Sequence, residues 1–170
     1  MIALDIYCDG SGTHQLGPAC IGVVVMLDAE PIVEVSEYVG DGTNNVAELR
    51  AIRRALYLAH AIGGPAVDAV IYSDSEYAIG SLTKEWTPRA NDKLVIAMRA
   101  QFARMPSARL VHVDGHAGIL GNEIADWLAG CARRRHLATL GIARPEKRRP
   151  TEESARKKYE RRMQKEAAGG

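Results

Sequence analysis

The sequence lacks any long apolar run. No stretch approaches the ~18 to 20 consecutive apolar residues that a membrane-spanning helix needs, and no basic region followed by an apolar segment marks a signal peptide. The 170 residues, 46% of them hydrophobic, suit one α/β domain with a buried core plus an appendage. We therefore expect a soluble, cytoplasmic protein with no membrane partner.

Cysteines are few, and internal repeats are absent. The three cysteines, Cys8, Cys20 and Cys131, are an odd number without a C-x-x-C spacing, and each has apolar neighbours. This pattern indicates neither a disulfide framework nor a zinc site. Buried free thiols are the better interpretation.

Positive and negative charge are separated along the chain, although the net charge is only +1. Residues 141–170 hold ten lysines and arginines and five acidic residues, a net charge of +5, so the first 140 residues carry −4. Pro145 and Pro150 interrupt this basic tail, which has no apolar stripe. We expect one folded domain over residues 1–140 and a tail over 141–170 that is disordered or a solvated helix.

The first forty residues contain three β-rich runs. Residues 3–8, 19–27 and 31–39 are separated by glycine, proline and aspartate, and no helical period lies between them. They predict an antiparallel meander. The first run breaks off at Asp9, which a glycine follows at once, and the loop over residues 11–18 is rich enough in glycine and proline to bring backbone close to a ligand.

The rest of the domain alternates helices and strands. Thr43, Asn44 and Asn45 offer capping chemistry for a helix that runs to about His60. Further strands are predicted over 67–73 and 109–113, and further helices from 76, from 92 or 93 to 105, and over 122–137. The order β-β-β-α-β-α-α-β-α predicts a five-stranded mixed sheet flanked by helices.

Four acidic residues stand where the fold alone does not require them. They are Asp9 at the strand break, Glu48 near a helix start, Asp74 at a strand end and Asp126 early in the last helix. Taken singly, each could be a turn residue, a helix cap or a charge that complements a helix dipole. Together they could hold magnesium ions, and two such ions about 4 Å apart can drive phosphodiester hydrolysis.

Four separated motifs resemble those of the type 1 ribonuclease H family, in the family's order and at near-family spacing over about residues 1–138. They are Asp9-Gly10-Ser11, Thr43-Asn44-Asn45-Val46-Ala47-Glu48-Leu49, Ser73-Asp74-Ser75, and Gly115-His116-Ala117-Gly118 followed by Gly121-Asn122-Glu123 and Asp126. The resemblance implies a ribonuclease H-like fold and endonucleolytic cleavage of the RNA strand of RNA–DNA hybrids.

The resemblance also assigns catalytic roles. It implies that Asp9, Glu48, Asp74 and Asp126 are the ligands of two Mg²⁺ ions when substrate is bound, with Mn²⁺ as a possible substitute. His116 matches the family's mobile histidine, assigned to proton transfer or product release, and imidazole can carry a proton at neutral pH. Without the flanking motifs, His116 would be an ordinary exposed loop histidine.

The resemblance places a further set of residues at the nucleic acid. Asn44 and Asn45 match asparagines that contact the minor groove of the hybrid, where an amide can both donate to and accept from a 2′-hydroxyl. Their alternative role is helix capping. The other implied contacts are Gly10 and Ser11 in the first motif, and Thr43 and Asn91 at a pocket for a DNA phosphate.

The sequence departs from the family at two places. Many members carry a basic protrusion after the second helix, whereas residues 81–89 contain only two basic residues, Lys84 and Arg89. We expect the basic residues of 144–165 to compensate, since phosphate contacts supply much of nucleic-acid affinity. A solubilising tail, or one that orders against a partner protein, is the alternative. Glu76 stands where the family often has glutamine, so the substrate range could include double-stranded RNA.

The favoured hypothesis is a monomeric, magnesium- or manganese-dependent ribonuclease H. A hybrid-binding module without catalysis is the alternative from another class, but concentrated negative charge near phosphates would give a pure binder no advantage. A related nuclease or transposase of the same fold is disfavoured by the Asn-Asn and Gly-His-Ala-Gly motifs.

Overall fold

The computed structural model describes residues 2–83 and 90–168. Their elements, in chain order, are β1 (Ala3–Ser11), β2 (Gly17–Leu27), β3 (Glu30–Gly42), α1 (Asn44–Gly63), β4 (Asp68–Ser73), α2 (Glu76–Thr83), α3 (Asp92–Phe102), β5 (Ala108–His112), α4 (Leu120–Thr139) and α5 (Glu152–Ala168).

The strands form one five-stranded mixed sheet in the order β3-β2-β1-β4-β5. β1, β2 and β3 pair antiparallel, whereas β4 lies parallel to β1 and β5 parallel to β4. Short connections suffice for the antiparallel strands, and helical crossovers deliver the two parallel ones. The predicted α/β fold with an opening antiparallel meander is therefore confirmed.

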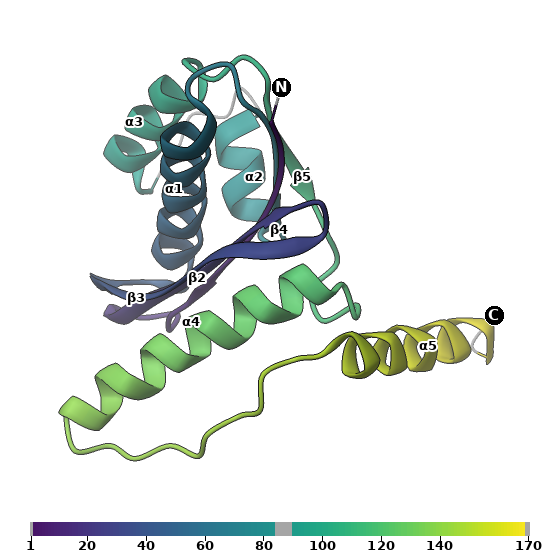
Figure 1. Cartoon of the computed structure of the whole chain (residues 1–170). Helices are drawn as coiled ribbons and strands as arrows, with labels where there is room; N and C mark the ends of the chain where they lie inside the picture. The colour runs from purple at the N-terminus through teal and green to yellow at the C-terminus, as the bar shows by residue number, and fades with distance from the viewer. Residues whose placement is uncertain (1, 84–89, 169–170) are drawn as a thin grey trace.

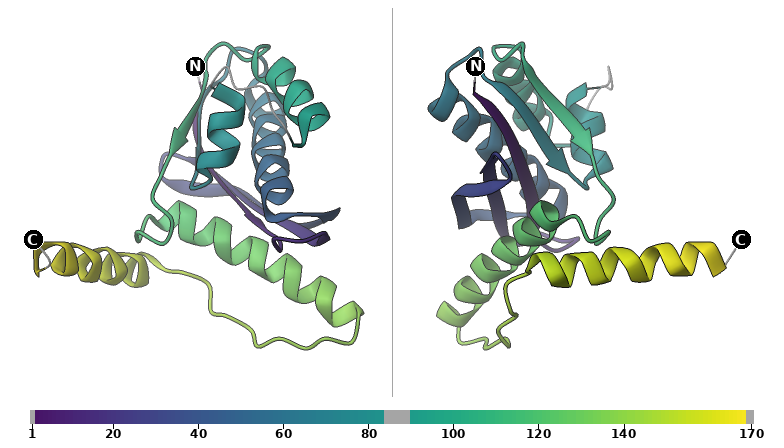
Figure 2. Two further views of the ribbon diagram at one scale, coloured as in Figure 1. Left: turned by 180° about the vertical axis from the view of Figure 1, so that it is seen from behind. Right: turned by 45° about the vertical axis from the view of Figure 1, so that its right-hand side comes forward.

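Helices cover both faces of the sheet (Figure 1). α1, α2 and α3 lie on one face and α4 lies on the other, as the view from behind in Figure 2 also shows. Alternating residues of β1 serve these two layers, because Leu4, Ile6 and Cys8 belong to the core beneath α1, whereas Tyr7 packs with the core beneath α4. The period of two along β1 thus fixes which side chains can reach which helix.

β1 continues further than the sequence indicates. The predicted strand end at Cys8 is wrong, because Asp9, Gly10 and Ser11 pair with Gly22, Ile21 and Cys20 of β2. An Asp-Gly pair favours a turn locally, but the backbone hydrogen bonds of the antiparallel ladder outweigh that preference. Asp9 therefore sits inside a strand, where pairing with Gly22 of β2 holds its backbone.

Both helix layers touch the sheet at glycines. A Cβ atom on Gly10 would lie 2.3 Å from the Glu48 nitrogen on α1, and one on Gly22 would lie 2.0 Å from the Ala125 oxygen on α4. Gly22 is the direct neighbour of Asp9 across the β1–β2 ladder. The two close approaches bring the helix segments that carry Glu48 and Asp126 to the strand that carries Asp9.

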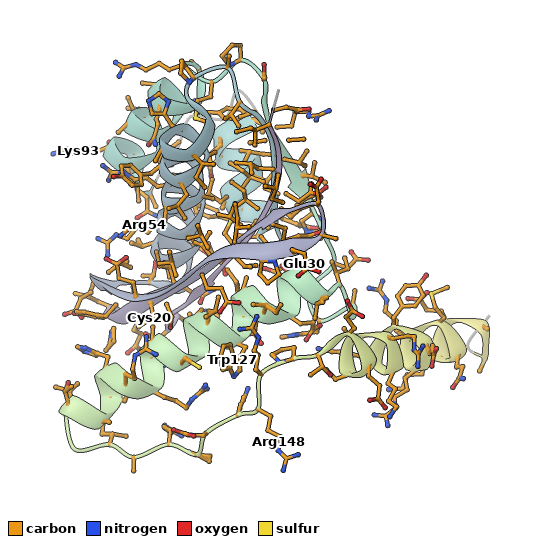
Figure 3. All side chains as sticks on the ribbon, in the orientation of Figure 1. Cys20, Glu30, Arg54, Lys93, Trp127 and Arg148 are labelled. Atoms are coloured by element: carbon orange, nitrogen blue, oxygen red, sulfur yellow. The ribbon has the colours of Figure 1, made fainter. Side chains whose placement is uncertain are left out.

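The tail leaves the end of α4 as an extended linker and finishes as α5 (Figures 1 and 2). The linker is fastened to the body, since the Trp127 Nε1 atom donates a hydrogen bond of 2.8 Å to the Lys147 carbonyl and Arg149 pairs with Glu34. Trp127 lies on the side of α4 that faces the linker (Figure 3). α5 is largely exposed, with Ala155 as its buried residue. The division into residues 1–140 and 141–170 stays a prediction.

None of the helices in residues 2–83 and 90–168 has the length and apolar content needed to span a membrane. The three cysteines are free thiols, with Cys8 and Cys20 buried as predicted, whereas Cys131 is partly exposed.

The contact at Gly22 predicts a sharp difference between two glycine substitutions near α4. Gly22→Ala should lower the free energy of unfolding by about 1–3 kcal/mol, because its methyl group would overlap the α4 backbone. Gly130→Ala is the control, since the nearest atom there is the end of the flexible Arg134 side chain at 3.1 Å. It should raise stability by about 0.5–1 kcal/mol through helix propensity. Urea unfolding of both variants measures this, and equal effects would contradict the packing.

Candidate active site

Three of the four predicted carboxylates meet at one point. Asp9, Glu48 and Asp74 each offer an oxygen within 4.8 Å of the other two. Asp9 and Glu48 are buried and Asp74 is half-buried. They come from β1, α1 and the residue that follows β4, so the fold gathers them from three elements.

The three carboxylates come together because β1 and β4 are parallel and because Gly10 has no side chain. β1 and β4 are parallel neighbours, so Asp9 and Asp74 lie toward the same, carboxyl-terminal edge of the sheet. Glu48 reaches that edge from α1 because Gly10 leaves room for the helix backbone. The Gly10 N–H group then serves both acids, donating to Asp9 Oδ1 at 2.8 Å and to Glu48 Oε2 at 3.1 Å.

Two asparagine amides orient the cluster from outside. The Asn44 Nδ2 group donates to Glu48 Oε1 at 3.4 Å, and the Asn44 Oδ1 atom accepts from the Gly12 N–H group at 3.0 Å. On the other side, Asn122 Nδ2 donates to Asp74 Oδ2 at 3.3 Å. The Asn122 Oδ1 atom is buried without a hydrogen-bond partner among the described residues. Both amides thus hold a carboxylate in a fixed direction.

Burial and mutual repulsion perturb the acids. Desolvation, followed by the charge of Glu48, raises the pKa of Asp9 well above its usual value. Desolvation, followed by the charge of Asp74, raises the pKa of Glu48 to about 8. Hydrogen bonds from Gly10, Asn44 and Asp9 act in the opposite direction on Glu48, but they do not prevail. Among the described residues no positive charge compensates the cluster, and a hard divalent cation with oxygen ligands fits it.

Asp126 lies beside this group and is not a member of it within the described residues. Its charge contributes to the raised pKa of Asp9, and it is half-buried on α4. Close packing of the Ala125 backbone against Gly22 sets its place. Asp126 remains a predicted ligand, on the opposite face of the sheet from Glu48.

His116 occupies an exposed loop between β5 and α4. Its backbone has φ of 55°, a left-handed conformation that is uncommon for a residue with a side chain. The preceding Gly115 approaches the cluster so closely that a Cβ atom there would lie 2.8 Å from Asp74 Oδ2. His116, Ser11 and Asp126 line a hollow of about 430 Å³, which Lys147 and Arg148 of the linker also border. The loop thus passes over Asp74, and the histidine borders the same hollow as Asp126.

The sequence matches the RNase H family over residues 2–134. The chain belongs to the RNase H family.

Individual RNase H proteins show the same likeness. Ribonuclease H of Cyanothece sp. is 32% identical over 136 residues, which are 73% of this chain and 85% of that protein. Ribonuclease HI of Haemophilus ducreyi is 32% identical over 142 residues, which are 76% and 89% of the two chains. The family assignment therefore rests on relatives that align over most of their length.

Solved RNase H structures agree with the fold. LC11-RNase H1, isolated from compost, has a TM-score of 0.70 at 28% identity, and the match covers 81% of this chain and 99% of that one. The same protein in complex with an RNA/DNA hybrid has a TM-score of 0.64 at 31% identity over 79% of this chain and 99% of that one. The five-stranded sheet and its helix layers are thus those of RNase H.

The residues predicted to contact nucleic acid lie at several places in this RNase H fold. Thr43 is the N-cap residue of α1 but makes no side-chain capping bond, so the capping alternative is not supported for it. Asn45 is exposed on the first turn of α1. Asn91 precedes α3 in a left-handed conformation, with φ of 59°, and its Nδ2 group donates to the Tyr77 hydroxyl of α2 at 3.1 Å.

Sequence reasoning missed the contacts of Asn44 and Asn122. The sequence predicts a substrate contact or a helix cap for Asn44, whereas its amide joins the Gly12 backbone to Glu48. Asn122 stands inside a recognised motif but received no role, and its contact with Asp74 spans 48 positions of sequence. Such long-range pairs leave no local signal. The predicted loss of the basic protrusion rests on Lys84 and Arg89, which lie outside the described residues.

The raised pKa values predict how metal-free RNase H responds to pH. The pKa of Glu48 is raised in the folded state. Protonated Glu48 therefore contributes stability that is fully present below pH 4.5 and is lost as the pH rises through about 8. The Tm in excess chelator should therefore fall across this range. In Glu48→Gln the fall should be smaller, because the variant should not lose about 1–3 kcal/mol of unfolding free energy that the wild type loses over this pH range. Exposed Glu30→Gln is the control, and an unchanged slope in Glu48→Gln would contradict the perturbation.

Proposed function

We propose that this chain cleaves the RNA strand of RNA–DNA hybrids by metal-assisted hydrolysis at the Asp9, Glu48 and Asp74 cluster. As a member of the RNase H family with the acidic triad in place, it is a ribonuclease H, an endoribonuclease. The identity of the metal and the roles of single residues are the proposal. The observation that carries it is the convergence of three carboxylates within 4.8 Å, two of them buried.

Asp9, Glu48, Asp74 and Asp126 would hold divalent ions, of which Mg²⁺ is the preferred species and Mn²⁺ a substitute. Two Mg²⁺ ions, when bound with substrate, would activate a water molecule and stabilise the leaving oxygen. The chain's own residues prepare this arrangement. The Gly10 N–H group and the Asn44 and Asn122 amides fix the directions of the carboxylates before substrate arrives, so little reorganisation is needed.

His116 is proposed to act in proton transfer during hydrolysis or in release of the product. It is exposed at the rim of the hollow that Asp126 lines, and imidazole can accept and release a proton at neutral pH. The close approach of Gly115 to Asp74 keeps its loop beside the cluster. Proton transfer or product release would then occur on the solvent side of the acids.

The two asparagines before Glu48, Asn44 and Asn45, have different roles. The Asn44 amide is committed to Gly12 and Glu48, whereas the Asn45 amide is exposed and has no hydrogen-bond partner in the described structure. We infer that Asn45 meets a 2′-hydroxyl in the minor groove, since an amide can donate and accept at once. The backbone of Gly10 and Ser11 would approach the RNA strand as well. Thr43 and Asn91 would contact a phosphate of the DNA strand.

The linker is proposed to supply part of the phosphate contact that a basic protrusion gives other members. Lys147 and Arg148 border the hollow shared with His116 and Asp126, and neither forms an ion pair in the described structure. The Arg148 side chain projects from the linker (Figure 3). The neighbouring Arg149, by contrast, pairs with Glu34 of β3. A cytoplasmic location, a monomeric state and tolerance of double-stranded RNA stay predictions.

A labelled RNA–DNA hybrid tests the mechanism. Asp9→Asn should lower the cleavage rate by about a thousandfold or more, because it removes a ligand charge at the centre of the cluster. Asp5→Asn is a matched control, since Asp5 lies on the same strand but is exposed and bonded to the Tyr72 hydroxyl. It should retain near wild-type cleavage. Undiminished cleavage by Asp9→Asn would contradict the mechanism, and wild type inactive with Mg²⁺ and Mn²⁺ would favour a binding module.

A salt series tests the linker. The double variant Lys147→Gln, Arg148→Gln should bind hybrid more weakly, and the slope of log affinity against log salt should fall by about 1 to 2. Arg104→Gln with Arg109→Gln removes the same charge from the turn after α3 and from β5, away from the Asp74 edge, and should change neither quantity. Equal slopes in both double variants would exclude this contact.

A further inference from the structure

α5 contacts the loop between β5 and α4 on both sides of His116. Before the histidine, Arg162 Nη2 lies 2.7 Å from Asp114 Oδ2. After it, Gly118 packs directly on the helix, where a Cβ atom would lie 2.5 Å from the Ala155 carbonyl oxygen and 2.6 Å from the Tyr159 nitrogen. α5, the last helix of the chain, therefore contacts the loop on both sides of His116, the proposed proton carrier.

Glu123 connects this helix to the loop by a second route. Its side chain is only 10% exposed, and its Oε1 atom accepts from the Gly118 N–H group at 3.2 Å. Lys158 on α5 donates to both oxygens of the same carboxylate, at 2.7 and 2.6 Å. The charge pair thus extends from α5 through a buried acid to the loop backbone two residues past His116.

The loop needs outside support because its backbone is in an unfavourable conformation. His116 has φ of 55°, whereas Gly118, with φ of 83°, takes a left-handed conformation that costs glycine little. A non-glycine residue in the left-handed region costs about 1 kcal/mol or more, and it persists where surrounding contacts impose it. Without α5, the contacts at Asp114, Gly118 and Glu123 would be lost together. His116 could then relax to a commoner conformation and move its imidazole.

We propose that α5 fixes the His116 loop in its working conformation, with Lys158 as a positioning residue that acts through Glu123. The catalytic consequence rests on the proposed function, in which His116 carries a proton. Lys158 lines the same hollow as Lys147, but unlike Lys147 it is bound to Glu123, and leaving Glu123 would strand a buried carboxylate without its cation. The charged residues of α5 therefore hold the His116 loop in place as well as keeping the helix solvated.

Two lysine variants separate this role from a general loss of charge. Lys158→Met removes the cation beside Glu123, whereas Lys157→Met removes the adjacent cation, whose partner is Glu153 on the same helix. Hydrogen exchange at the Gly118 amide reports the loop directly and needs no substrate. We expect it to accelerate about tenfold in Lys158→Met and to stay unchanged in Lys157→Met. Lys158→Arg should restore slow exchange.

Kinetics supply the second readout. Lys158→Met should lower kcat about three- to tenfold with KM near wild type, since it disturbs orientation rather than binding. In a His116→Ala background the same substitution should have no further effect on kcat, because it acts through the histidine.

Several results would overturn the proposal. They are unchanged Gly118 exchange in Lys158→Met, a kcat loss that persists in His116→Ala, a raised kcat, or an effect confined to KM and salt dependence, which would make Lys158 a nucleic-acid contact. A wild-type protein without hybrid cleavage would instead overturn the proposed function. The exchange measurement would still decide whether α5 holds the loop.

Discussion

The close contact of two helices with the sheet at Gly10 and Gly22 is the constraint on which the active site depends. α1 approaches Gly10 from one face and α4 approaches Gly22 from the other, both within distances that no side chain permits. Because Gly22 faces Asp9 across the ladder, these contacts deliver Glu48 and Asp126 to one aspartate. Any larger residue at either position would push a helix outward and separate the carboxylates.

This packing holds like charges together at a cost in stability. Asp9 and Glu48 are buried, and burial raises the pKa of both. The charge of Glu48 raises the pKa of Asp9 further, and the charge of Asp74 raises that of Glu48. The large core beneath α1 and the smaller core beneath α4 offset that cost, as expected where function requires an unfavourable local arrangement. The acids are thus preorganised for a cation that supplies the missing positive charge.

The sequence predicts most of the fold because local patterns and strand pairing agree over most of it. The β-rich runs, the helix signals at residues 43–45 and the order of elements lead to the observed sheet. The prediction fails at Asp9 and Gly10, where a turn signal is overridden by pairing with β2. The four motifs identified the acids, but their spacing could not reveal that the Asn44 amide points at Glu48.

The tail illustrates the limit of pattern reasoning further. Its charged sequence indicates a solvated segment, and most of α5 is indeed exposed. The pairs Lys158 with Glu123 and Arg162 with Asp114 join residues 35 and 48 positions apart, and no periodicity within the tail encodes them. Charge complementarity to a particular loop becomes visible only when the fold places both partners.

The most direct test of the central claim is the number of protons released when Mg²⁺ binds at pH 7, measured by pH-stat in the absence of substrate. The ions must displace the protons that burial keeps on the acids, so we expect about one proton or more per protein molecule, and fewer in Glu48→Gln. Saturation by Mg²⁺ without proton release, or equal release from Glu48→Gln, would contradict a metal site built from these carboxylates.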